Sequence, residues 1–226
     1  MDVNLKAEGV KKGLRSREPF LIKGLNLFLS GRKDGSFQAG DGLFFKGEKC
    51  FEGFNLKVSR NGTEVPPGKG SNFSLTGSLA ELRSFFPEAD LSIIRQQFIP
   101  PGADALLLEY HFLNTRGEEE ALELELEFFL NGLRGETIFD KKKGAFISSL
   151  GDGGLLILQI PPRLPAFSAD GEKSRFRCSL FLSPFGQKVL HLFFGLGNTR
   201  EEAECACAFL VEKHPEEIRK ALGVSG

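Results

Sequence analysis

The segment ALELELEFFL (121–130) alternates between apolar and acidic side chains, and no other feature of the sequence constrains the fold as strongly. Successive side chains on a β-strand point to opposite faces, so an extended conformation separates the two kinds of side chain. The apolar face carries Leu122, Leu124, Leu126 and Phe128, and the acidic face carries Glu123, Glu125 and Glu127. We expect a strand in a sheet with one buried and one solvated face.

Most of the remaining sequence consists of short apolar runs separated by Gly, Pro, Asn and Asp, at intervals of roughly 8 to 15 residues, which is typical of all-β proteins. The expected strands are 20–29, 43–46, 51–59, 72–77, 91–99, 104–113, 121–130, 136–140, 144–149, 154–160, 174–183 and 187–196. So many strands predict two large antiparallel sheets packed face to face, with a closed barrel as the alternative.

Two pairs of neighbouring strands are predicted to form antiparallel hairpins. The turn TRGEE (115–119) would join the run 105–114 to the run 121–130. The turn Pro184-Phe185-Gly186 would join the last two expected strands in the same way.

Both ends of the chain differ from this β-rich middle. Residues 1–19 are charged and lack a clear period, so we expect an N-terminal arm before a β-domain at 20–197. Residues 198–226 have a helical pattern: Thr199 and Glu202 match a capping box, and an apolar stripe follows at Ala203, Ala206, Cys207 and Leu210. Pro215 is expected to start a second helical segment over 215–222, so this region resembles a linker to a further domain.

Composition excludes several classes of function. The 29 Lys and Arg residues nearly balance the 30 Asp and Glu residues along the whole chain, so no basic face for nucleic acid is expected. No apolar run approaches the length of about 18 residues that a membrane span needs, and Met1 to Phe20 lacks a secretory apolar region, so we expect a cytoplasmic protein with no membrane partner.

The four cysteines, Cys50, Cys178, Cys205 and Cys207, are too few for a disulfide scaffold. Cys205 and Cys207 stand two apart in the helical segment and would point about 200° away from each other, so we expect neither a metal site nor a cofactor.

The aromatic residues are 23 Phe, a single Tyr and no Trp. Sugar-binding surfaces usually use rings that also carry a polar group, and Phe offers none. The abundance of Phe therefore predicts a large core, or an apolar surface that another domain covers. We expect such a surface to include Phe44, Phe45, Phe51, Phe85 and Phe86.

Four stretches together resemble the N-terminal domain of bacterial and archaeal glycogen debranching enzymes of the amylo-alpha-1,6-glucosidase type. They are FLIKG (20–24), GDGLFFKGEKCFEGFNLKVSRNGTE (40–64), IIRQQFIPPGADALLLEYHFLNTRGEEEALELELEF (93–128) and HLFFGLGNTREEAECACAFLVEKHPEEI (191–218). The resemblance implies a galactose mutarotase-like β-supersandwich, with the glucosidase chemistry in an (α/α)-barrel that follows it in the same chain or is a separate chain. Where the family often has Asp-x-Arg, this chain has Gly47-Glu48-Lys49, and Lys49 lacks the planar fork of an arginine.

The resemblance places a group of charged residues where the family makes contacts toward substrate or the catalytic domain. The group comprises Asp41, Lys46, Glu48, Lys49 and Arg95. For each of them, ordinary surface charge is the competing interpretation.

Two sets of residues invite a catalytic interpretation. Residues two apart on a strand lie about 6.5 to 7 Å apart, so Glu123, Glu125 and Glu127 have the spacing of an inverting glycosidase pair, although a solvated strand face predicts the same pattern. Glu109 and His111, with His191 also available, could supply the acid and base of a mutarotase-like enzyme, or simply a solvated pair.

The sequence predicts a non-catalytic domain of a glycogen or α-glucan debranching hydrolase. Its partners would be a catalytic (α/α)-barrel, which it braces, and α-glucan, whose binding it helps to shape. The alternatives are a freestanding carbohydrate-binding module and a mutarotase-like sugar epimerase.

Overall fold

A computed structural model describes residues 17–68, 71–129, 137–150, 153–159, 168–170, 174–212 and 217. The strands are β1 (Pro19–Lys23), β2 (Leu27–Arg32), β3 (Gly42–Phe45), β4 (Glu48–Phe51), β5 (Gly53–Arg60), β6 (Thr63–Glu64), β7 (Ser71–Thr76), β8 (Leu79–Phe86), β9 (Leu91–Phe98), β10 (Ala105–Asn114), β11 (Glu120–Phe129), β12 (Thr137–Asp140), β13 (Ala145–Ser149), β14 (Leu155–Gln159), β15 (Ser168–Asp170), β16 (Arg175–Leu182) and β17 (Gln187–Gly197). A 3-10 turn, η1 (Pro87–Ala89), precedes β9, and the helix α1 (Arg200–Glu212) follows β17.

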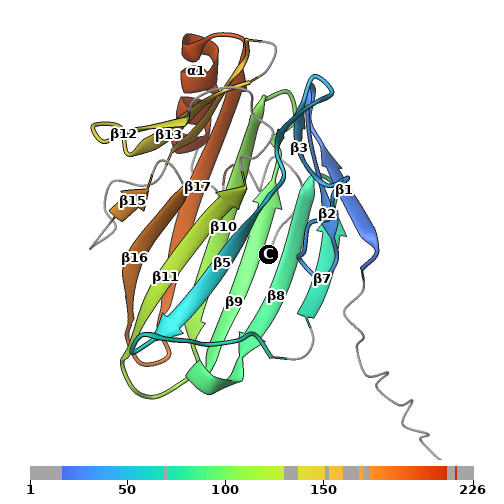
Figure 1. Cartoon of the computed structure of the whole chain (residues 1–226). Coiled ribbons are helices and arrows are strands. Elements are labelled where there is room, and N and C mark those ends of the chain that lie inside the picture. The colour runs from blue at the N-terminus through green and yellow to red at the C-terminus, as the bar shows by residue number, and fades with distance from the viewer. Residues whose placement is uncertain are drawn as a thin grey trace, which may run out of the picture.

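The strands form three antiparallel sheets (Figure 1). The large sheet has the order β12-β13-β14-β17-β10-β9-β8-β7, and the facing sheet, β15-β16-β11-β5-β6, packs against it. A side sheet, β1-β2-β3-β4, contributes residues to the same core. The predicted two-sheet antiparallel sandwich with a C-terminal helix is therefore confirmed, and the side sheet adds to it.

Both predicted hairpins are wrong, because each connection passes from one sheet to the other. β10 pairs with β9 and β17 in the large sheet, whereas β11 pairs with β5 and β16 in the facing sheet. The two connections also contact each other: the Asn114 amide nitrogen Nδ2 donates to the Ser183 carbonyl at 3.0 Å, and the Phe185 amide donates to the Arg116 carbonyl at 2.9 Å. The sequence shows that β10 and β11 each have an apolar face. These two faces are buried because the two strands lie in different sheets that pack against each other across the core.

Several strand boundaries also differ from expectation. The expected strand 20–29 is a hairpin, β1–β2, whose turn is closed by the Gly24 amide donating to the Leu27 carbonyl at 2.7 Å. The expected strand 51–59 is split at Glu52, between β4 and β5. β8 was not predicted, because LAELRSFF (79–86) alternates too irregularly to read as a strand.

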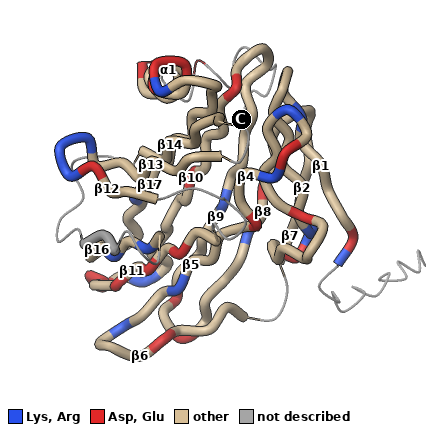
Figure 2. Tube along the Cα trace, turned by 45° about the horizontal axis from the view of Figure 1, so that its top comes forward, with Lys and Arg blue, Asp and Glu red and all other residues tan. Residues whose placement is uncertain are grey.

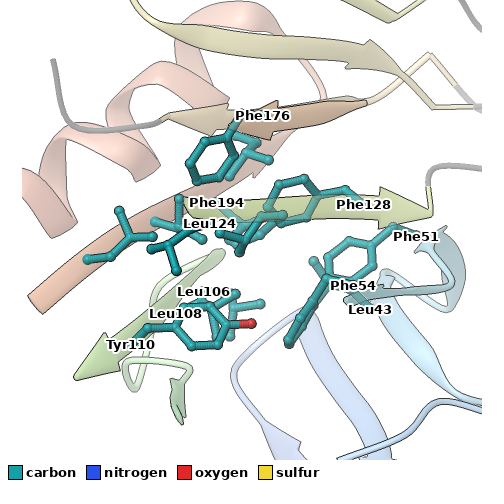
Figure 3. Close-up of a cluster of buried hydrophobic side chains, with 14 of the residues drawn as sticks. Leu43, Phe51, Phe54, Leu106, Leu108, Tyr110, Leu124, Phe128, Phe176 and Phe194 are labelled. Carbon is teal, nitrogen blue, oxygen red and sulfur yellow. The ribbon is translucent and has the colours of Figure 1, made fainter. Parts of the chain in front are cut away.

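The core between the large and facing sheets is rich in aromatic rings (Figure 3). The Phe194 ring of β17 lies 5.8 Å from that of Phe128 and 5.5 Å from that of Phe51, measured between ring centroids. The expected apolar surface is wrong for Phe45, Phe51 and Phe86, which are buried. Much of the Phe content is thus used inside the domain.

Phe44 and Phe85 have different surroundings from those three. Phe44 is half-buried and stacks on Phe28 with ring centroids 4.5 Å apart. Phe85 remains exposed on β8.

The helix α1 packs on the outer face of the large sheet, over β17, β14 and β10. Its predicted cap is confirmed: the Glu202 amide donates to Thr199 Oγ1 at 3.2 Å, and Glu202 Oε2 accepts from the Asn198 amide at 2.7 Å. The predicted stripe faces the sheet, with Ala203, Cys207 and Leu210 buried.

The contact between α1 and the sheet is closest at Gly195, where an added Cβ would lie 2.2 Å from the Ala203 carbonyl oxygen. Among the described residues, no helix is long and apolar enough to cross a membrane. The expected arm lies mostly outside the described residues, as does the second helical segment apart from position 217.

Candidate functional site

The outer face of the large sheet carries a row of polar side chains beside α1. Antiparallel register places Glu109 of β10 between His191 of β17 and Gln96 of β9, and Gln96 lies opposite Glu81 of β8. The row therefore brings together residues from β8, β9 and β10, which follow one another along the chain, and from β17, which comes much later in the sequence.

Glu109 is the centre of this row. Its side chain is only 3% exposed, and its Oε1 lies 2.9 Å from His191 Nε2. Its Oε2 lies 3.7 Å from His111 Nε2, and the Gln187 amide contacts His111 Nδ1 at 3.1 Å. We call Glu109, His111 and His191 the histidine cluster.

The sequence interpretation paired Glu109 with His111, but His191 is the nearer partner. Glu109 and His111 are two apart on one strand, which the sequence reveals directly. The position of His191 opposite Glu109 depends on the register between β10 and β17, for which the sequence carries no local signal.

Glu81 forms the other end of the polar row. It accepts hydrogen bonds from Gln96 Nε2 at 2.7 Å and from Arg83 Nε at 2.8 Å. Burial raises the pKa of the Glu81 carboxyl, but these hydrogen bonds and the charge of Arg83 outweigh it, so the pKa lies below its ordinary value. Glu81 is thus held as a carboxylate.

The acidic face of β11 belongs to the other sheet, and basic residues of β5 and β16 lie opposite its glutamates. Figure 2 marks the acidic and basic positions along these strands. Glu125 lies 2.5 Å from Arg177, 3.3 Å from Lys57 and 3.5 Å from Arg175. Burial raises its pKa, but hydrogen bonds from Arg177 and Lys57 outweigh that effect and lower it below its ordinary value. A glycosidase acid needs a raised pKa, so this geometry favours a charged surface over a catalytic pair.

Three of the five predicted contact residues converge on one loop, residues 33–41. Asp41 is buried and accepts from Arg32 Nε and from the Gln38 amide, both at 2.8 Å. Lys49 Nζ donates to the Ala39 carbonyl at 2.8 Å, and Arg95 Nη2 donates to the Gly35 carbonyl at 3.2 Å. These three side chains hold the loop in one conformation.

Arg95 reaches this loop from the interior of the sandwich. Its guanidinium carbon lies 5.1 Å from the ring centre of Phe54, and its charge lies close to the Tyr110 hydroxyl. Burial lowers the pKa of Arg95, and it raises the pKa of Tyr110 to about 12 although the neighbouring Arg95 opposes that rise. Arg95 is therefore a half-buried cation that supports the loop from the core side.

Of the other two predicted contact residues, Lys46 lies in the turn between β3 and β4, and Glu48 is the first residue of β4. Lys46 Nζ donates to Asn198 Oδ1 at 2.7 Å and so connects this turn to the residues just before α1. Glu48 is exposed. Lys46 and Glu48 therefore stand apart from loop 33–41.

Burial decides the chemistry of two of the four free cysteines. Cys207 Sγ donates to the Ile157 carbonyl at 3.5 Å, and burial raises its pKa to about 12. Burial also raises the pKa of Cys178 to about 11. Both are therefore protonated thiols near neutral pH. Within the described residues there is no group of three or more His, Cys, Asp or Glu suited to a metal ion.

Comparison with known proteins identifies the fold but no family. No family model and no curated protein matches the sequence. Among solved structures, a bacterial glucoamylase complexed with acarbose matches 96% of this chain and 38% of its own, with a TM-score of 0.62 and 10% identity. A putative kojibiose phosphorylase from the human microbiome matches 76% of this chain, with a TM-score of 0.56 and 11% identity, and the chain spans only 27% of its length.

A third solved structure, a putative aldose 1-epimerase from Escherichia coli K12, is matched over nearly its whole length. It matches 80% of this chain and 99% of its own, with a TM-score of 0.50 and 8% identity. The fold of this chain is thus the galactose mutarotase-like supersandwich, which occurs in these neighbours both as part of a longer chain and as nearly a whole chain.

Proposed function

We propose that this chain is a non-catalytic domain of a carbohydrate-processing enzyme of the debranching glycoside hydrolase type. In this proposal residues 20–197 brace a catalytic (α/α)-barrel and help to shape glucan binding, and residues 198–226 lead toward that barrel. The observation that carries the proposal is the match of 96% of this chain to 38% of a glucoamylase chain.

The side chains support a non-catalytic role. The Glu109 carboxylate is buried against two histidines, and Glu125 is surrounded by three basic side chains. A hydrolase acid or base must instead reach the scissile bond with a pKa suited to proton transfer. Glu125 does not meet that requirement, because its basic partners lower its pKa, and Glu109 is buried in this conformation.

The proposal is tested on the source gene and on the two polypeptides. We expect a glucosidase barrel to be encoded beyond the codon for Gly226, or in a neighbouring gene. Co-expression with this chain should raise the thermal midpoint of the barrel and its debranching activity. A genomic context without such a barrel, or a barrel unaffected by this chain, contradicts the proposal.

A second candidate function, a mutarotase-like epimerase, rests on the histidine cluster. Glu109 and His191 lie 2.9 Å apart on neighbouring strands, so a carboxylate and an imidazole, the two groups that such an enzyme could use as base and acid, are close together. Polarimetry of freshly dissolved α-D-glucose tests this candidate. An accelerated mutarotation that Glu109→Gln abolishes would favour the epimerase over the bracing domain.

A further inference from the structure

A pocket of about 350 Å³ opens between loop 33–41 and the start of β5. Its walls include Phe37 and Gln38 from the loop, Glu52, Phe54 and Asn55 around the start of β5, and Phe129 at the end of β11. The volume lies at the lower end of the range for small-molecule sites, which is about 300–1,000 Å³. None of these six residues was a candidate in the sequence interpretation.

One part of the pocket wall is aromatic. The Phe37 and Phe54 rings meet edge to face with centroids 5.0 Å apart, and Phe129 is 36% exposed. Gly53 permits this arrangement, because a Cβ there would lie 2.7 Å from Cγ of Phe37. Phe54 is buried and supports Phe37 from below, whereas the half-buried Phe37 and the exposed Phe129 offer apolar surface on which the C–H groups of a sugar ring can stack.

The other part of the wall is polar and exposed. The side chains of Gln38, Glu52 and Asn55 have no hydrogen-bond partner within the part of the chain that the structure describes. A carboxylate and two amides offer both donors and acceptors in planar groups, which suits the neighbouring hydroxyls of a sugar. The phenylalanine rings cannot form hydrogen bonds through their side chains, so in this pocket the hydrogen-bonding groups come from these three polar side chains.

The wall formed by loop 33–41 is preorganised. Asp41, Lys49 and Arg95 hold it from three directions, as described above. Ser36 adds a local bond, because its hydroxyl donates to Asp34 Oδ1 at 2.6 Å. A wall that is already ordered loses little conformational entropy on binding, which favours measurable affinity for a small neutral ligand.

We infer that this pocket binds a glucose-based saccharide through the aromatic side chains Phe37 and Phe129 and the polar side chains Gln38, Glu52 and Asn55. The pocket chemistry indicates a neutral polyhydroxylated ring, and the choice of glucose rests on the proposed function. Asp41, Lys49 and Arg95 act here as positioning residues, because they hold the loop and do not themselves line the pocket.

Titration of the whole 226-residue chain with maltotriose, by calorimetry and by saturation-transfer NMR, tests the inference. We expect saturable binding that weakens about tenfold in Asn55→Ala and in Glu52→Gln, which corresponds to the loss of one good hydrogen bond in each case. Asn72→Ala and Glu123→Gln are matched controls, because both remove the same groups from exposed strand positions away from the pocket. Neither control should change the affinity.

Three results would overturn the inference. They are absence of maltotriose binding to the folded chain, equal weakening in the pocket variants and their controls, and displacement of maltotriose by tetramethylammonium, which would assign the pocket to a cation. All the variants change exposed side chains, so circular dichroism should confirm that they fold. The bracing experiment contains no test of sugar binding by this chain, so the two proposals can fail separately.

Discussion

Each of the two outer faces of the sandwich carries glutamate side chains, yet the surroundings of these glutamates differ between the faces. On the facing sheet, the Glu125 side chain is 15% exposed and lies among Lys57, Arg175 and Arg177. On the large sheet, the Glu109 side chain is 3% exposed and lies against two histidines. One face is a network of formal charges, and the other is a buried carboxylate whose nearest partners are imidazole rings.

This difference between the two faces shows that the two-residue repeat of a strand determines to which face a side chain points, but not which groups surround it there. Glu109 and Glu125 both point away from the core between the two sheets, as their places in β10 and β11 dictate. On the large sheet, α1 packs over β10, β14 and β17 beside the polar row, and the buried Glu109 carboxylate depends on its histidines. Displacing α1, removing the Glu109 carboxylate and removing the charges around Glu125 should therefore lower the free energy of unfolding by different amounts.

The largest effect is expected from Gly195→Val, which displaces α1. The new side chain would meet the Ala203 carbonyl at 2.2 Å, so α1 must move away from the sheet. We expect a loss of about 3 kcal/mol in the free energy of unfolding, measured in urea, and faster amide exchange over 200–212. Gly40→Ala is the control, because no atom lies within 4 Å of its Cβ. Protected amides in α1 of the valine variant would contradict the close contact.

Glu109→Gln should have the next largest effect, because it removes the buried charge while keeping the shape of the side chain. We expect a loss of about 2 kcal/mol in the free energy of unfolding near neutral pH, since the histidines lose their carboxylate partner. Glu125→Gln, on the exposed face, should cost less than about 1 kcal/mol. Equal losses in the two variants would remove the distinction between the faces.

The contribution of Glu125 should depend on pH in the acid range. Its folded pKa lies below its ordinary value of 4.5, so its stabilising contribution is fully present above pH 4.5 and is lost as the pH falls through the folded pKa. The stability difference between the wild type and Glu125→Gln should therefore shrink on acidification below pH 4.5. Urea unfolding at a series of pH values measures it, and a difference that grows on acidification would reverse the sign.

The smallest effect is expected from salt and from Arg177→Ala. The Arg177 side chain is 61% exposed, so its pair with Glu125 is screened by ions and should contribute only a few tenths of a kcal/mol. Raising the NaCl concentration to about 1 M should abolish the difference between this variant and the wild type, while the cost of Glu109→Gln persists. Thermal unfolding at both salt concentrations compares the two.

Local patterns in the sequence predicted local structure well. The faces of β11 and the cap at Thr199 followed from neighbouring residues, and both are confirmed. Strand partners did not follow, because β10 and β11 each present an apolar face that either a hairpin or a crossing to the second sheet can bury. β8 was missed because its pairing with β9, and not its own alternation, makes it a strand.

The candidate site shows the same limit. Glu109 and His111 were found because they are close in sequence, whereas His191 depends on register. Asp41, Lys49 and Arg95 were grouped by resemblance, but their common contact, loop 33–41, depends on a fold that brings Arg95 to Gly35. The pocket residues Glu52 and Asn55 carry no motif and emerge only from the walls around them.

The positions of β16 and β17 have a consequence for folding during synthesis. β17 lies between β14 and β10 in the large sheet, and β16 lies between β15 and β11 in the facing sheet. During synthesis on the ribosome, neither sheet can be completed until residues 175–197 have emerged, because β16 and β17 are inner strands. Contacts between strands so distant in sequence imply slow folding, with exposed strand edges that chaperones can bind until the last strands arrive.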